Sequence, residues 1–450
     1  MVHTSSSGGI PEFDVVGVGF GPSNLALAVA LTELDDEGTA PSTVFLERQA
    51  SFGWHRGMLL DDATMQVSFL KDLVTLRNPT SRFSFLSYLH ERGRLVDFIN
   101  HKTLFPLRVE FHDYLEWAAR QVDGMVRYGH EVIGVRRVTD DDRIDWVEVL
   151  VDTGGGTAVL RARNLVFATG LQPSLPPGVV ADDRIWHSRD LLHGVAALGD
   201  EQPKGFVVVG AGQSAAEVTA FLHDRYADAD VSAVYSRFGY SPADDSSFAN
   251  RIFDPAAVDD FYEAPGWVKD QLLTYHANTN YSVVDSDLIA ELYRRTYREQ
   301  VLGQQRLRMM NVSRLVGAVS SPDGVRVTVE ALTTGEQTVL DTDVLVCATG
   351  YDPVEPATLL GELNGFCRRD AAGRLEVGRD YRVATDDALG VGIYLQGGTE
   401  HSHGISSSLL SNGAVRAADI LTAIRRRSEE RSRSSAEAER DATRVASRTA

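Results

Sequence analysis

The chain has 450 residues, of which 43% are hydrophobic and 24% are charged, so we expect a soluble globular protein with two or three domains. Its formal net charge of −19 argues against nucleic acid or an anionic membrane as a partner, because either needs a basic surface. The sequence contains no apolar run long enough to span a bilayer, and the polar residues 1–9 do not resemble a signal peptide, so we expect a cytoplasmic protein.

The first informative motif is a glycine-rich turn between an expected strand and an expected helix. Residues 13–16 predict a buried strand, residues 22–36 predict a helix, and the run Gly17-Val18-Gly19-Phe20-Gly21-Pro22 joins them. Glycines let the backbone approach a pyrophosphate, and the first turn of the helix offers free N–H groups and the positive end of its dipole. The motif therefore predicts a dinucleotide site formed by Gly17, Gly19, Gly21 and Pro22.

Two further features belong to this first unit. Glu47 follows the next expected strand, at 44–46, where an acid can bind the ribose hydroxyls of a dinucleotide; the alternative is a surface acid. Residues 51–90 have few turn signals and mix polar with apolar side chains, which indicates an insertion that lines a site. The polar and aromatic residues of this insertion include Trp54, His55, Gln66, Lys71, Arg77 and Asn78.

A second glycine-rich turn occurs near the middle of the chain. There the expected strand 206–209 leads into the run Gly210-Ala211-Gly212-Gln213-Ser214-Ala215. Two other expected strands both end in Ala-Thr-Gly, at 168–170 and at 348–350, and small residues let a strand end pass close to a nucleotide. Two such turns predict two dinucleotides, and the usual pair is a flavin with the nicotinamide that reduces it.

The order of these motifs predicts an α/β fold with two Rossmann-like domains, the second inserted in the first. We expect an FAD-binding domain at 12–203 and 346–425 and an NADPH-binding domain at 204–345. Within the second domain, residues 244–285 are expected to line the substrate site. The flanking segments are expected to be a flexible arm at 1–11 and a disordered tail at 426–450.

Two other classes of site are disfavoured by the cysteines and histidines. Cys347 and Cys367 do not form a Cys-x-x-Cys pair, which removes the dithiol of flavin disulfide reductases, the commonest rivals with two such turns. Glu400, His401 and His403 could suggest a metal, but the glycines around them favour a loop over the flavin. We therefore expect no metal.

Several short motifs occur in the order typical of one enzyme family. They are Lys71-Asp72-Leu73, Asn78-Pro79, Phe248-Ala249-Asn250, Asn278-Thr279-Asn280-Tyr281, Ala348-Thr349-Gly350-Tyr351 and His403-Gly404-Ile405-Ser406. With these motifs the chain resembles, across about 12–425, the flavin-dependent N-hydroxylating monooxygenases, with the bacterial L-ornithine N5-monooxygenases as the nearest group.

The resemblance implies an activity. In such enzymes NADPH reduces FAD, the reduced flavin captures O2 as a C4a-hydroperoxyflavin, and its distal oxygen passes to the side-chain amine of L-ornithine. The product, N5-hydroxy-L-ornithine, would serve siderophore or hydroxamate biosynthesis. A homo-oligomer, a tetramer by resemblance, is implied as well. The residues offer no obvious dedicated base for the substrate amine.

The resemblance also implies substrate contacts. Lys71 would bind the substrate carboxylate, and Asn250 would read the α-amino and carboxylate groups with its amide. Asn280 would meet the side-chain amine and the nicotinamide ribose. Ser408 would close the pocket, with its neighbours Ser406 and Ser407 as alternatives. Without the resemblance, Lys71 could be a surface lysine and Asn250 a turn-forming residue.

Cofactor contacts follow from the same resemblance. Gln66 would approach the reactive flavin, with Trp54 and His55 packed near its ring. Arg237 is the candidate for the 2′-phosphate of NADPH, although the family's arginine corresponds to Ser236, so weak discrimination against NADH is expected. The other expected NADP or flavin contacts are Gly210, Gly212, Gln213, Ser214, Thr349 and Gly350.

Three alternatives stay open. The same reaction could act on L-lysine or on a diamine, but a diamine would leave Lys71 without a carboxylate. A Baeyer–Villiger or drug-type flavin monooxygenase is suggested by Phe167-Ala168-Thr169-Gly170 followed by Trp186-His187-Ser188, but it gives Asn250 and Asn280 no role. A flavin-binding protein without catalysis is the third alternative; it would consume no oxygen with NADPH.

Overall fold

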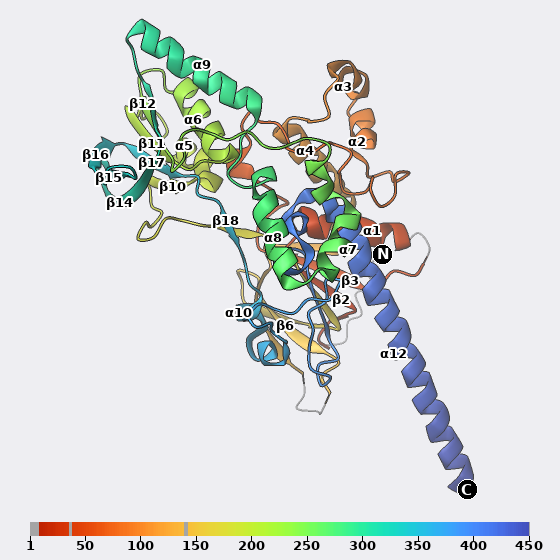
Figure 1. Ribbon diagram of the computed structural model, residues 1–450. Coiled ribbons are helices and arrows are strands. Elements are labelled where there is room, and N and C mark those ends of the chain that lie inside the picture. The colour runs from red at the N-terminus through yellow and green to blue at the C-terminus, as the bar shows by residue number, and fades with distance from the viewer. Residues whose placement is uncertain (1–8, 36–37, 139–142, 450) are drawn as a thin grey trace.

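Two parallel sheets form the frame of the molecule. The computed structural model describes residues 9–35, 38–138 and 143–449 (Figure 1). The strand order is β19-β8-β2-β3-β4 in the first sheet and β10-β17-β11-β12-β13 in the second, with every neighbouring pair parallel. The predicted α/β class with two Rossmann-like units is confirmed. Most of the predicted arm, residues 1–8, lies outside the described residues.

The first sheet is covered on both faces, so its central strands are almost wholly apolar. One face packs against α1 (Pro22–Asp35), α4 (Arg108–Gln121) and the start of α12 (Gly413–Thr449). The other face packs against a mixed sheet of order β1-β7-β6-β5, in which β1 and β7 are parallel and the other pairs are antiparallel. Burial on both faces is typical of parallel sheets. The strands of the first sheet are β2 (Val15–Val18), β3 (Thr43–Glu47), β4 (Val126–Tyr128), β8 (Asn164–Phe167) and β19 (Gly392–Leu395). Those of the mixed sheet are β1 (Glu12–Phe13), β5 (Glu131–Arg137), β6 (Val147–Asp152) and β7 (Thr157–Ala162).

The second sheet repeats this plan with different layers. Helices α5 (Leu191–Ala197), α6 (Gln213–Arg225) and α9 (Ser286–Leu302) share a core with one face, and an antiparallel three-stranded sheet packs on the other. Because β10 pairs with β17, this domain begins before the predicted boundary at 204. Its strands are β10 (Ile185–His187), β11 (Gly205–Val209), β12 (Asp230–Val234), β13 (Leu307–Met310) and β17 (Val344–Cys347). The antiparallel strands are β14 (Ser313–Ser321), β15 (Gly324–Ala331) and β16 (Gln337–Thr342).

Two kinds of connection join the domains. The chain crosses between them twice, and the crossing segments pair as the antiparallel strands β9 (Leu171–Pro173) and β18 (Tyr351–Pro353). The segment 244–285 returns from the second domain, and Arg379 of the first domain binds Asp259 of its helix α7 at 2.5 Å. The helices of this segment are α7 (Pro255–Glu263) and α8 (Gly266–His276), and the remaining helices are α2 (Phe85–Glu91), α3 (Leu95–His101), α10 (Ala357–Leu360) and α11 (Glu400–His403).

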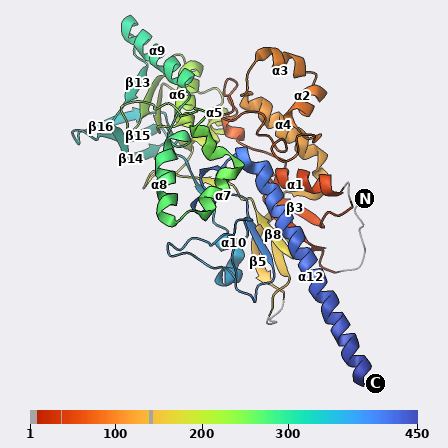
Figure 2. The ribbon, with the colours of Figure 1, turned by 45° about the vertical axis from the view of Figure 1, so that its right-hand side comes forward.

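The predicted disordered tail is instead helical. Residues 426–449 continue α12, which runs away from the body of the molecule (Figures 1 and 2). Arg, Glu and Ala are good helix formers, and ion pairs such as Arg426–Glu430 and Arg433–Glu429 have the i,i+4 spacing that supports a helix. The prediction of disorder was therefore wrong. Residues 426–449 lack an apolar period because their helix is surrounded by solvent. In the described residues, no helix has the length and apolarity to cross a membrane.

Candidate active site

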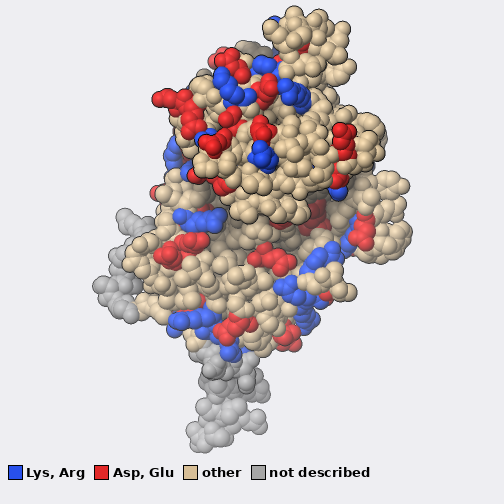
Figure 3. All heavy atoms as spheres, turned by 90° about the vertical axis from the view of Figure 1, so that its left-hand side faces the viewer, with Lys and Arg blue, Asp and Glu red and all other residues tan. Residues whose placement is uncertain are grey.

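A large cleft lies between the two domains. Its volume is about 2900 Å³, and its walls include both glycine turns, the crossing strands and residues of the insertion 51–90. On the face shown in Figure 3 the surface is hollowed between the two lobes. Of the predicted site residues, these line the cleft: Gly19, Gly21, Pro22, Glu47, Trp54, His55, Gln66, Lys71, Gly210, Gly212, Gln213, Ser214, Asn250, Asn280, Thr349, Gly350 and Ser408.

The first glycine turn fits tightly between two strands. Gly19 has a φ of +83°, and a Cβ added there would lie 2.6 Å from the carbonyl oxygen of Ala168. Gly17 does not line the cleft, and its contact with the cofactor stays a prediction. A Cβ at Gly17 would lie 2.2 Å from the ring of Phe45, so this glycine is needed for packing beneath the turn. The turn therefore brings the start of α1 to the cleft wall.

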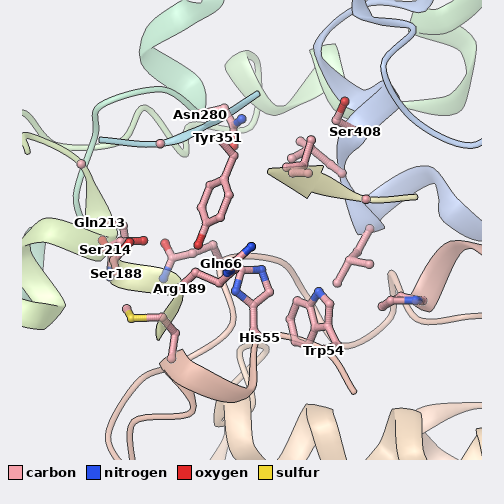
Figure 4. A pocket seen from close by; sticks show the side chains of 18 of the residues that line it. Trp54, His55, Gln66, Ser188, Arg189, Gln213, Ser214, Asn280, Tyr351 and Ser408 are labelled. Atoms are coloured by element: carbon pink, nitrogen blue, oxygen red, sulfur yellow. The ribbon is translucent and has the colours of Figure 1, made fainter. Parts of the chain in front are cut away.

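The second turn repeats the same contact. Gly210 has a φ of +148°, and a Cβ there would lie 2.3 Å from the carbonyl oxygen of Ala348. Gly212 is the N-cap of α6 and supplies no capping side chain, so the first N–H groups of α6 lack an internal partner. Gln213 and Ser214 open this helix at the cleft (Figure 4). Both turns thus present a helix N-terminus, which favours anions, to one space.

Glu47 has a structural role that the sequence did not reveal. Its side chain is buried, and its two carboxylate oxygens accept hydrogen bonds from the backbone N–H groups of Phe20 at 2.7 Å and Gln49 at 2.8 Å. The carboxylate therefore holds the first glycine turn against β3. Glu47 also lines the cleft, and its binding to a ribose stays a prediction.

An aromatic wall closes one side of the cleft. The rings of Trp54 and His55 lie 4.6 Å apart in a T-shaped arrangement, and Tyr351 contacts both His55 and His187 (Figure 4). His55 has a φ of +51°, which is uncommon for a residue with a side chain. Burial, together with the charge of Arg108, lowers the pKa of His55 to about 4. The ring is therefore neutral at pH 7, and its low pKa makes it a weak base for the substrate amine.

A polar network that sequence reasoning missed joins the two domains across the cleft. Gln66 donates from Nε2 to Asp285 Oδ2 at 2.8 Å, and Gln213 donates to the same oxygen at 3.2 Å. Arg108 binds both oxygens of Glu217 at 2.8 and 2.9 Å, with both side chains mostly buried. Burial raises the pKa of Asp285, and the hydrogen bond from Gln66 opposes this rise. Removing one partner of such a buried ion pair typically costs about 3–5 kcal/mol.

Lys71 lies half-buried at the cleft wall beside the second domain. Its Nζ is 5.6 Å from the centre of the Phe253 ring, and burial lowers its pKa while Asp254 opposes the shift. No ion pair within 4 Å joins Lys71 to a carboxylate in the part of the chain that the structure describes. Its neighbour Asp72 is buried and accepts three backbone N–H bonds at 2.7–3.0 Å, which fixes the loop that carries Lys71. The cation is thus held in place with its charge available.

The other predicted substrate residues line the same cleft as Lys71 and come from several elements. Asn250 donates from its side-chain amide to the carbonyl of Asp245 at 2.7 Å, and Asn280 follows the short helical turn after α8. Among the three consecutive serines, only Ser408 is exposed and lines the cleft. Ser411, which was not predicted, also lines the cleft; it is 2% exposed and its hydroxyl has no protein partner. Their contacts with a substrate stay predictions.

Two predicted groups have other partners. Arg237 does not line the cleft, because its guanidinium donates to the carbonyl of Ser282 at 2.9 Å. Ser282 itself lines the cleft, so the role of Arg237 toward NADPH stays a prediction. His401 and His403 bind backbone carbonyls, of Leu375 at 2.9 Å and Arg379 at 3.3 Å. In the described part of the chain, no group of three or more acidic, histidine or cysteine side chains could hold a metal.

His403 makes the stability of the protein depend on pH. Its ring is fully buried against Tyr381, and burial lowers its pKa to about 4, below the 6.5 of an unfolded chain. The folded state thus binds fewer protons, so the contribution of His403 is present above pH 6.5 and is lost as the pH falls toward 4. Between pH 7 and pH 5 the loss should be about 2 kcal/mol, as urea unfolding at the two pH values can measure. Gln does not titrate, so in His403→Gln the free energy of unfolding should fall by about 2 kcal/mol less between pH 7 and pH 5 than in the unmodified protein. An equal fall in both proteins would show that His403 is not the group responsible.

The chain is similar to known proteins over most of its length. Residues 11–353 match the family model described as L-lysine 6-monooxygenase/L-ornithine 5-monooxygenase. The L-ornithine N(5)-monooxygenase of Burkholderia cepacia is 43% identical over 400 residues, which cover 87% of this chain and 90% of that protein.

Two solved structures extend the similarity to three dimensions. An ornithine N-hydroxylase from Kutzneria sp. 744, solved with reduced FAD, NADP+ and L-ornithine, has a TM-score of 0.90 and 52% identity, covering 93% of this chain and 100% of that one. The L-lysine 6-monooxygenase of Pseudomonas syringae has a TM-score of 0.81 and 33% identity, covering 92% and 99%. The chain belongs to the L-lysine 6-monooxygenase/L-ornithine 5-monooxygenase family.

Proposed function

We propose that this protein uses FAD, NADPH and O2 to hydroxylate the side-chain amine of L-ornithine, giving N5-hydroxy-L-ornithine for siderophore or hydroxamate biosynthesis. The observation that carries the proposal is one cleft lined by both glycine turns and by Lys71. The sequence of the chain is also more similar to the two ornithine enzymes, with 52% and 43% identity, than to the lysine enzyme, with 33% identity. We also propose a cytoplasmic homo-oligomer, with a tetramer as the expected size.

The residues of the cleft fit the two cofactors. At the first turn, a side chain on Gly19 would fill the space beside Ala168, and the N-terminus of α1 can receive the FAD diphosphate. The unpartnered hydroxyl of Ser411 supplies a further polar group to the same wall. At the second turn, the N-terminus of α6 can receive the phosphates of NADPH. When bound, FAD would take electrons from NADPH and activate O2, so that one oxygen atom of O2 reaches the amine and the other leaves as water.

The chain's own residues would position the substrate. Lys71 would pair with the carboxylate of ornithine, since its cation has no carboxylate partner within 4 Å in the described part of the chain. Asn250 and Asn280 would orient the two amino groups from the second domain. The aromatic wall of Trp54 and His55 would exclude water from the reacting centre. A neutral His55 would add no positive charge that repels the substrate amine.

The reaction is tested by measuring hydroxylamine formed and NADPH consumed with L-ornithine, L-lysine and putrescine in parallel. We expect product from ornithine matched to the NADPH consumed. Product from lysine instead would keep the chemistry and overturn the substrate. Peroxide without hydroxylamine from any amine would contradict the proposal and would direct the search to ketone or thioether substrates. FAD binding without NADPH-dependent oxygen consumption would indicate a non-enzymatic flavoprotein.

Lys71→Ala separates substrate binding from flavin reduction. Loss of a charge-assisted hydrogen bond costs about 1.5–3 kcal/mol, so the KM for ornithine should rise about 10- to 150-fold. The FAD content and the rate of flavin reduction by NADPH should change little, because Lys71 is assigned to the substrate alone. Lys204→Ala, at an exposed lysine paired with Asp228, is the matched control and should behave as the unmodified protein. If Lys71→Ala loses FAD first, Lys71 is structural.

A further inference from the structure

Arg416 is a buried cation whose acceptors are all uncharged. It lies in the first turns of α12 and is 2% exposed. Its Nη2 donates to Ser23 Oγ at 3.1 Å, its Nε donates to Gln396 Oε1 at 3.3 Å, and its Nη1 donates to the carbonyl of Ser407. A guanidinium stays protonated in proteins, so a full positive charge is enclosed here among neutral groups.

Two other arginines of this protein, both less buried than Arg416, are paired with acids. Arg108 binds the carboxylate of Glu217, and Arg379 binds those of Asp259 and Asp419. No ion pair of this kind involves Arg416 among the residues that the structure describes. Burial lowers the pKa of Arg416, which reflects the unfavourable environment of its charge. An uncompensated buried charge is costly, so a negative group supplied from outside the chain would stabilise it.

The charge lies directly behind the cleft wall. Ser23 and Gln396 contact Arg416 on one side and line the cleft on the other. Gln396 also donates to the carbonyl of Ser23 and to Asn24 Oδ1, both at 3.0 Å, which holds this part of the wall rigid. Ser23 lies in the first turn of α1, immediately after the first glycine turn. The N-termini of α1 and α12 add their positive dipole ends to the same region.

We propose that Arg416 is the fixed counter-charge for FAD and that it makes the bound flavin easier to reduce. This inference rests on the proposed FAD site. Hydride transfer from NADPH moves two electrons and one proton to the flavin, leaves NADP+, and adds one negative charge to the cofactor. A fixed positive charge near the cleft stabilises the reduced state more than the oxidised state, because only reduction adds that charge. Arg416 acts through the wall, as a positioning residue, and does not touch the reacting atoms.

The midpoint potential of FAD in the holoenzyme tests this inference. Arg416→Gln removes the charge and keeps hydrogen-bonding groups, and it should shift the ratio of reduced to oxidised flavin at least tenfold toward the oxidised form, a fall of about 30 mV. Arg416→Lys keeps the charge and should stay near the potential of the unmodified protein. The matched control is Arg427→Gln, since Arg427 on the same helix is also partly buried but donates to Gly390 outside the cleft. It should leave the potential unchanged.

An unchanged potential in Arg416→Gln would overturn the inference. If Arg416→Gln folds but does not retain FAD, the affinities of the two apoprotein variants for FAD are compared instead. Tight binding by Arg416→Lys and weak binding by Arg416→Gln would support the counter-charge. Equal affinities of the two variants would contradict it. Failure of the proposed function looks different, because the unmodified protein would then bind no FAD or form no hydroxylamine. An active unmodified enzyme with an unshifted Arg416→Gln potential would refute the inference alone.

Discussion

The organisation of this protein depends on how closely its backbone approaches itself at two glycine turns. At Gly19 and Gly210 an added Cβ would lie 2.6 and 2.3 Å from the carbonyl oxygens of Ala168 and Ala348. Each turn can therefore pack against the end of a neighbouring strand only if it has no side chain. This contact leaves the following helix N-terminus free to face the cleft. Because it occurs in both domains, two helix N-termini open onto one space.

The cleft also needs the two domains to hold a fixed relation. The Arg108–Glu217 ion pair and the hydrogen bond from Gln66 to Asp285 cross the cleft from the first domain to the second, and Gln213 of the second domain donates to the same oxygen of Asp285. These bonds keep the aromatic wall and the glycine turns facing each other. Flavin chemistry requires little acid–base assistance from the protein, so a rigid cleft with suitably placed charges accounts for most of what the chain must provide.

Local patterns predicted the parts of the structure that depend on local physics. The glycine turns, the Ala-Thr-Gly strand ends and the lining insertion at 51–90 follow from residue type and spacing, whereas Lys71, Asn250 and Asn280 required the family resemblance.

Long-range contacts left no such pattern. The partners Arg108 and Glu217 are 109 residues apart, and Arg416 and Ser23 are 393 apart. The three-residue strand β10 joins the second sheet only by pairing with the distant β17, so the predicted boundary at 204 came too late. The solvated end of α12 needs no apolar face, so its helix could not be recognised from hydrophobic periodicity.

The most direct measurement compares the cofactor content and the anaerobic reduction by NADPH of Gly19→Ala and Gly210→Ala. We expect that Gly19→Ala folds without FAD, while Gly210→Ala retains FAD whose reduction by NADPH is greatly slowed. Loss of FAD from both variants, or reduction of Gly210→Ala at the unmodified rate, would contradict the assignment of one dinucleotide to each turn.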